Sequence, residues 1–133
     1  MLVVDASVLV VALADDGADG VAARARLRDE HLSAPELVDL EVASVLRRQV
    51  MAGRIGARRA ALALTDLESL PLHRASHRVL VSRCWELRET VSVYDAAYVA
   101  LAETLGAMLL TADARLGRAS GPRCPIEVLT PRF

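Results

Sequence analysis

Short hydrophobic runs alternate with longer amphipathic segments along the whole chain. The runs have the length and composition of buried strands, and they lie at residues 2–4, 31–34, 72–75, 108–111 and 126–129. Hydrophobic positions at helical spacing predict helices at residues 8–14, 21–28, 35–52, 57–70, 76–89 and 93–105. This alternation predicts a parallel sheet with helices on both faces, the α/β class.

Proline, glycine and serine set the expected helix boundaries. Pro35 suits the first position of a helix, and Gly53 suits its end. Gly17 and Gly20 separate the first two helices, and Ser76 and Ser92 are suitable N-caps for the helices that follow them. The expected elements therefore join through short turns, and no repeat or internal linker separates them.

Length and composition indicate one globular unit. At 133 residues, the chain is expected to form a single domain, residues 1–133. No apolar stretch approaches the roughly 20 residues that a membrane span needs. The N-terminus lacks the basic start and long apolar core of a signal peptide, so we expect a cytoplasmic protein with no membrane partner. The net charge of -1 argues against a passive electrostatic binder of nucleic acid.

Four acidic residues stand where folding alone explains an acid poorly. Asp5 and Asp113 each follow a hydrophobic run. Glu41 lies on the hydrophobic stripe of one helix, and Asp95 opens another. In an open α/β sheet the ligand crevice lies beyond the carboxyl ends of the strands, which is where Asp5 and Asp113 are expected.

Each acid also has a structural explanation when it is taken singly. Asp5 can be a turn residue that accepts backbone N–H bonds, and Asp113 can be a helix N-cap. Asp95 stands three residues after Ser92 in a capping-box pattern. Glu41 has the weakest structural explanation, because a carboxylate on a hydrophobic stripe needs an arginine, a hydrogen bond or a cation to offset its burial.

Taken together, the four acids indicate a metal site. Carboxylates gathered at one crevice repel one another, and a divalent cation is the simplest means of keeping them ionised. Hard oxygen ligands suit Mg²⁺, for which Mn²⁺ can substitute, and such ions are commonly held by one or two carboxylates plus phosphate oxygens of a substrate. The pattern therefore favours metal-assisted hydrolysis of a phosphodiester.

Four segments of the chain resemble a known family in their order and spacing. They are residues 4–7 (VDAS), 35–42 (PELVDLEV), 94–102 (YDAAYVALA) and 110–116 (LTADARL). Across nearly the whole chain they resemble a PIN domain, and more narrowly a VapC toxin of a toxin–antitoxin pair. The resemblance implies a PIN-like three-layer α/β/α fold with about five parallel strands, an Mg²⁺-dependent endoribonuclease, a homodimer and a VapB-type antitoxin. An RNA-processing PIN nuclease without an antitoxin is the alternative.

The same resemblance assigns roles to individual residues. The family's acidic quartet is matched by Asp5, Glu41, Asp95 and Asp113. Asp5 and Asp95 match the direct metal ligands, and the other two acids would bind through water or a second ion. Ser7 and Thr111 match small hydroxyl positions that orient ligands or water. Family members often carry a further acid shortly after the last aspartate, where this chain has residues 114–116 (ARL), so the number of metal ions stays open.

Three other groups of residues are weaker candidates for a functional site. His73 and His77 have the spacing of a helical metal pair, but the neighbouring sequence does not favour one helix, so a surface or packing role is expected. Arginines around Gly53 could contact phosphate or form a solvated helix face, and they are Arg47, Arg48, Arg54, Arg58 and Arg59. Tyr94 and Tyr98 are expected in the core or in a dimer interface rather than stacked on bases.

Two other aspartate-centred α/β classes fit less well. A haloacid-dehalogenase-like phosphatase typically carries a second acid two residues after its first aspartate, where this chain has Ser7. A response-regulator-like phosphoacceptor generally needs a lysine, whereas all 16 basic residues here are arginine. A PIN fold used only for binding is disfavoured because all four acids are present.

Overall fold

The computed structural model describes residues 1–130, in which five parallel strands form one sheet. The strands are β1 (Leu2–Val4), β2 (Leu32–Pro35), β3 (Leu72–Ala75), β4 (Met108–Thr111) and β5 (Ile126–Val128). They lie in the order β3-β2-β1-β4-β5, and every neighbouring pair is parallel. The predicted α/β class and the parallel sheet of about five strands are both confirmed.

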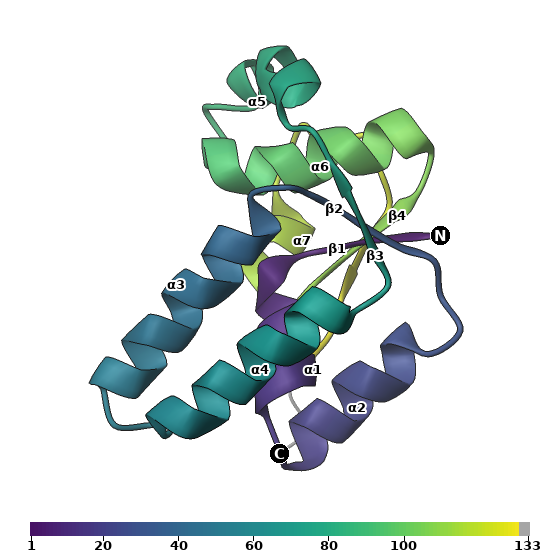
Figure 1. Cartoon of the computed structure of the whole chain (residues 1–133). Coiled ribbons are helices and arrows are strands. Elements are labelled where there is room, and N and C mark those ends of the chain that lie inside the picture. The colour runs from purple at the N-terminus through teal and green to yellow at the C-terminus, as the bar shows by residue number, and fades with distance from the viewer. Residues whose placement is uncertain (131–133) are drawn as a thin grey trace.

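Helices cover both faces of the sheet (Figure 1). They are α1 (Ala6–Ala14), α2 (Ala18–Leu27), α3 (Val38–Met51), α4 (Ala57–Ser69), the 3₁₀ helix η1 (Arg78–Leu80), α5 (Val81–Glu86), α6 (Val93–Leu105) and α7 (Ala114–Arg118). Helix α1 packs against α2, α3 and α4 on one face, and α6 lies on the other face with α5 beside it. This is the expected three-layer arrangement. No helix among residues 1–130 is long and apolar enough to cross a membrane.

Strand β1 occupies the middle of the sheet, between β2 and β4. Helices cover both of its faces, so its residues are almost completely buried and form a continuous hydrophobic run. The parallel register sets Val4 opposite Leu110, and the next residues, Asp5 and Thr111, therefore emerge together at the carboxyl edge. The chain continues to β2 on one side of β1 and reaches β4 on the other. Such a switch point is where open α/β sheets bind ligands.

The third helix begins later than expected, because Pro35 belongs to a strand. Pro35 is the last residue of β2, and α3 begins at Val38. Strand β1 pairs with β2 only as far as Ser33, so the missing N–H of Pro35 interrupts no bond to β1. The next N–H, from Glu36, donates to the carbonyl of Ala75 at 2.8 Å and continues the pairing with β3.

Helix α2 begins three residues earlier than expected, at Ala18 instead of Val21. Gly20 is buried within this helix, where a Cβ atom would lie 1.8 Å from the carbonyl oxygen of Asp15. The turn after α1 can approach α2 this closely only because residue 20 has no side chain. Gly20 therefore permits a close backbone contact and does not separate two helices.

The prediction of a single helix over residues 76–89 is wrong. The chain forms η1 and then the short helix α5, which ends at Glu86. Beyond it, the Thr90 N–H donates to the Leu87 carbonyl at 3.1 Å, and the Thr90 hydroxyl donates to the Ser120 carbonyl at 2.8 Å. This contact with a distant loop holds the segment in a turn, and helical periodicity gives no sign of it.

Candidate active site

The first aspartate lies at the carboxyl end of β1. The N–H of Asp5 donates to the carbonyl of Leu110 at 2.9 Å, which extends the pairing of β1 with β4. The residue is only 6% exposed. Thr111 Oγ1 and Ser7 Oγ both donate to Oδ2 of Asp5, at 2.7 and 2.9 Å. Two hydroxyls thus hold a buried carboxylate in one orientation, and they are the two hydroxyls that the sequence singled out.

The same two hydroxyls also fix the turn after β4. Ser7 Oγ accepts from the N–H of Ala112 at 3.0 Å, and Thr111 Oγ1 accepts from the N–H of Asp113 at 3.0 Å. Asp113 Oδ1 in turn accepts from the N–H of Arg115 at 2.9 Å, so Asp113 is the N-cap of α7. The capping alternative for Asp113 is confirmed. Asp113 nevertheless lines an open pocket together with Asp95, so capping does not remove it from the site.

Glu41 lies half-buried in the first turn of α3. Tyr98 Oη donates to Glu41 Oε1 at 2.5 Å, across from α6. No salt bridge joins Glu41 to an arginine among residues 1–130, so the arginine-pair alternative is wrong. A buried tyrosine hydroxyl is the hydrogen-bond donor that this acid required.

Tyr98 is the site residue that sequence reasoning missed. Its side chain is fully buried, as expected of a core residue, whereas Tyr94 is 67% exposed. The bond to Glu41 was not expected. Tyr98 follows Asp95 by three positions, which places both on one face of α6, and that spacing was the available signal.

Asp95 is the third residue of α6. Its N–H donates to Ser92 Oγ at 3.1 Å, so Ser92 is the N-cap and this half of the expected capping box is present. The Asp95 side chain lines an open pocket of about 270 Å³ together with Asp113 and Arg115. Like Asp113, Asp95 combines a structural position at a helix start with a carboxylate that faces the pocket.

Burial and mutual repulsion raise the pKa of Asp5, Glu41 and Asp95. Burial is the largest cause that raises the pKa of Asp5, and repulsion from Asp113 raises it further. Burial also raises the pKa of Glu41, with added repulsion from Asp5 and Asp95. The pKa of Asp95 is raised by burial and then by Asp5 and Asp113. The structure therefore brings together the four acids that lie far apart in the sequence.

This donor set fits a hard divalent cation. Among residues 1–130, no three His, Cys, Asp or Glu side chains converge closely enough to enclose a metal ion by themselves. Mg²⁺ does not require such a cage, because it keeps several waters and takes one or two carboxylates plus phosphate oxygens. A cation would also relieve the repulsion that raises these pKa values.

The other candidates lie elsewhere. Arg59 Nη2 donates to the carbonyl of Leu13, near the end of α1 opposite to Asp5, and the same guanidinium bonds Asp16. Arg59 is therefore not part of the acidic group, and Arg54 lines a separate pocket with Asp15 and Asp16. His73 lies on β3 and His77 precedes η1, so the two do not share a helix.

Comparison with known proteins gives one consistent result. The PIN domain family model matches residues 2–122. Ribonuclease VapC9 of Mycobacterium tuberculosis is 44% identical to this chain over 97% of this chain and 98% of that protein. The structure of VapC20 of M. tuberculosis, a sarcin–ricin loop cleaving toxin, aligns with a TM-score of 0.65 at 19% identity, covering 82% of this chain and 87% of the other. VapBC2 of Rickettsia felis, bound to a DNA fragment from their promoter, aligns with a TM-score of 0.68 at 13% identity, covering 96% and 97%.

Proposed function

This chain belongs to the PIN domain family, and on that premise we propose that it is the endoribonuclease toxin of a type II toxin–antitoxin pair. Its relatives along nearly the whole chain are VapC ribonucleases. The observation that carries the proposal is the group of four acids around the buried, hydroxyl-anchored Asp5. Such a group suits the hydrolysis of a phosphodiester with a metal-activated water.

The acids would bind the metal ion, and neighbouring hydroxyl groups orient two of the acids. Asp5 and Asp95 would hold a Mg²⁺ ion, with Glu41 and Asp113 beside it. When bound, the ion lowers the pKa of a bound water and offsets charge on the phosphoryl oxygens. Ser7 and Thr111 fix the direction of the Asp5 carboxylate through their hydroxyl groups. The Tyr98 hydroxyl does the same for Glu41, and supporting bonds of this kind commonly matter for metal affinity.

The proposal is tested by combining purified protein with labelled total RNA. Cleavage is expected in Mg²⁺ or Mn²⁺ and is expected to stop in EDTA, because the acids supply no nucleophile without a cation. Expression in a bacterial host is expected to arrest growth. Co-expression of the product of the neighbouring gene, as a VapB-type antitoxin, is expected to relieve the arrest.

Two results would count against this function. Cleavage that persists in EDTA would contradict the metal-dependent mechanism. Metal-dependent cleavage without growth arrest would favour the alternative, an RNA-processing PIN nuclease with no antitoxin. The structural neighbour VapBC2 of R. felis carries both VapB and VapC in its name, which supports the proposal of an antitoxin partner.

An exposed apolar surface supports a homodimer. Val81 on α5 and Val93 and Tyr94 on α6 line a shallow groove. Trp85, one turn after Val81 on α5, is also exposed, with the Arg88 guanidinium over its ring. Trp85 alone is 62% exposed. Contiguous apolar surface of this kind marks interaction sites, and a two-fold dimer uses the same patch on both copies.

Val81→Glu is expected to convert the dimer into a monomer, because it places a charge in the apolar groove. Light scattering after gel filtration would then give half the wild-type mass. Leu62→Glu is the matched control, since Leu62 is also exposed but lies on α4 in the other helical layer. A monomeric wild type, or the same change in both variants, would contradict this interface.

A further inference from the structure

The open pocket beside the acids contains one cationic side chain. Asp95 and Asp113 form its acidic side, and Thr90 and Ser92 contribute hydroxyl groups from the segment before α6. Arg115, in α7, is the single positively charged residue among the described residues that line the pocket. It lies within residues 114–116, the segment directly after Asp113, which contains no further acid.

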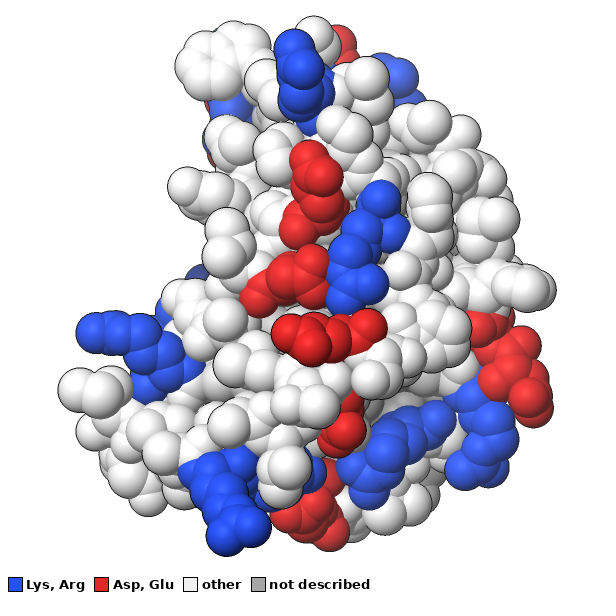
Figure 2. Space-filling view, in the orientation of Figure 1, with Lys and Arg blue, Asp and Glu red and all other residues white. Residues whose placement is uncertain are grey.

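Arg115 differs from the arginines that stabilise the fold. Four of these hold a carboxylate through two parallel bonds, and the pairs are Arg26–Glu127, Arg59–Asp16, Arg74–Asp39 and Arg83–Glu103. On the face drawn in Figure 2, some basic side chains lie next to acidic ones and others stand apart from them. The Arg115 side chain is instead 86% exposed and only its Nε approaches an acid, Asp113, at 3.4 Å. Its terminal nitrogens have no hydrogen-bond partner within residues 1–130.

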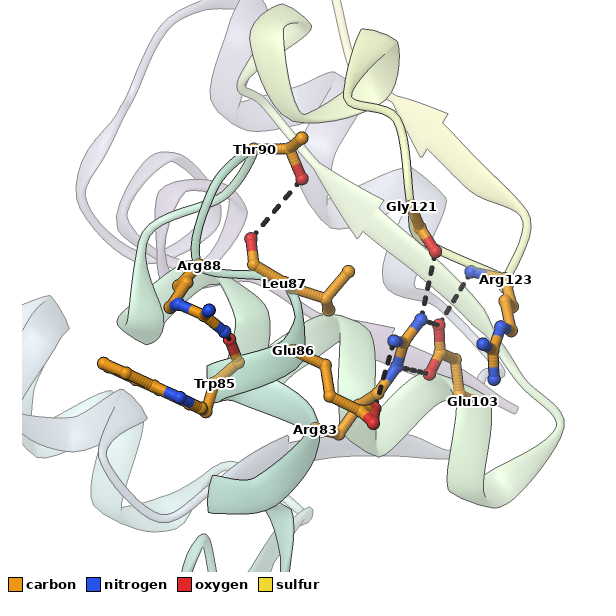
Figure 3. A network of polar contacts seen from close by, with 9 residues as sticks. All are labelled: Arg83, Trp85, Glu86, Leu87, Arg88, Thr90, Glu103, Gly121 and Arg123. Atoms are coloured by element: carbon orange, nitrogen blue, oxygen red, sulfur yellow. Dashed lines mark hydrogen bonds and ion pairs between the residues drawn. The ribbon is translucent and has the colours of Figure 1, made fainter.

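The segment before α6, which lines the pocket with Thr90, Val91 and Ser92, is bonded to the loop after α7. Arg83 bonds Glu103 on α6 and donates to the Gly121 carbonyl at 3.0 Å (Figure 3). Thr90 Oγ1 donates to the Ser120 carbonyl at 2.8 Å in the same region. These bonds tie the segment before α6 to the loop after α7. These bonds therefore hold one side of the pocket in place.

A phosphate is the ligand that this combination favours. The acids alone repel a polyanion, and a cation bound among them would offset only part of their charge. A guanidinium with free terminal nitrogens can hold two phosphate oxygens at once. The Ser92 hydroxyl, which accepts from the N–H of Asp95, keeps its own hydrogen available for a further bond.

We propose that Arg115 binds the oxygens of an RNA phosphate in this pocket and so positions the backbone beside the acidic group. This inference rests on the proposed ribonuclease function and names the place where its substrate is held. Arg115 acts here as a substrate-binding residue that contacts a phosphate, and the acids carry the hydrolysis.

The test measures RNA binding without cleavage. Full-length Asp5→Asn protein is titrated into fluorescently labelled single-stranded RNA of mixed sequence, and anisotropy is followed over a series of salt concentrations. Adding Arg115→Ala is expected to weaken binding about tenfold, as the loss of one charged hydrogen-bonding group does. The slope of log affinity against log salt is expected to fall by about 0.7, the value for one phosphate contact on a single strand.

Two further variants make the outcome specific. Arg115→Lys is expected to keep the salt slope but to recover only part of the affinity, because lysine lacks the guanidinium fork. Arg118→Ala removes another exposed arginine of α7 that does not line the pocket, and it is expected to leave both values unchanged.

The results distinguish a failure of the role proposed for Arg115 from a failure of the proposed ribonuclease function. Unchanged affinity in Arg115→Ala, an equal loss in Arg118→Ala, or no RNA binding by the Asp5→Asn protein at low salt would overturn the role of Arg115. An Arg115-dependent change in binding would support that role even if the wild type cleaved no RNA. In that case the ribonuclease proposal alone would fail.

Discussion

Asp5→Asn is expected to abolish RNA cleavage while it stabilises the metal-free protein. Loss of a direct ligand removes transition-state stabilisation worth about 4 kcal/mol, or on the order of 10³-fold in rate. The stability gain arises because Asp5 is a buried carboxylate whose pKa is raised mainly by burial. Asparagine carries no charge to desolvate, so the gain is expected to be about 2 kcal/mol at neutral pH.

The gain in stability must depend on pH, and its sign follows from the raised pKa. A carboxyl whose pKa is higher in the folded than in the unfolded protein stabilises the fold below the unfolded value, here 3.8. That stabilisation is lost as the pH rises through the folded pKa. Wild type and Asp5→Asn should therefore have similar stability in acid and diverge toward neutral pH.

Urea unfolding with and without Mg²⁺ measures both effects. Mg²⁺ is expected to raise the unfolding free energy of the wild type, by about 2.7 kcal/mol at a concentration 100 times Kd, and to do little for Asp5→Asn. Asp66→Asn removes the same charge from an exposed position on α4 and serves as the control. An Asp5→Asn protein that is less stable than wild type at neutral pH, or that cleaves RNA at the wild-type rate, would contradict the assigned role.

Most of the fold could be predicted because its elements carry local signals. The strands are hydrophobic runs, and Ser92 and Gly106 bound α6 as an N-cap and a left-handed C-cap. The errors arose where a tertiary contact decides the local structure. Pro35 suits a helix start as well as a strand end, and only the pairing of Glu36 with β3 distinguishes the two. Gly20 would suit a turn, but α2 needs it for a close backbone contact.

The sequence predicted which acids form the site, but not all of the residues that form hydrogen bonds with them. Asp5 and Asp113 follow strands, and the topology of a parallel sheet brings such residues to one edge. The partner of Glu41 lies 57 residues away in the sequence, on the opposite helical layer. No local pattern distinguishes a tyrosine that only fills the core from one whose hydroxyl reaches an acid. The roles assigned to the site residues remain predictions that the variants described here test.

Thr111→Val is expected to destabilise the protein and to reduce cleavage, although the two side chains have nearly the same shape. Thr111 Oγ1 is fully buried, donates to Asp5 Oδ2 at 2.7 Å and accepts from the Asp113 N–H at 3.0 Å. Valine would leave a buried carboxylate and a backbone N–H without these partners, at a cost of about 1 to 3 kcal/mol. Loss of this support for a metal ligand is expected to reduce activity about 10- to 100-fold.

The pH dependence separates this effect from simple repacking. Removing a donor to the Asp5 carboxylate raises its folded pKa further, since the Thr111 hydrogen bond is the largest of the causes that lower it. The deficit of Thr111→Val should therefore grow as the pH rises from 4 to 8. Thr111→Ser keeps the hydroxyl and should lose a smaller, pH-independent amount. In an Asp5→Asn background the pH-dependent part of the valine effect should vanish, and if it persists the Thr111–Asp5 bond is not its cause.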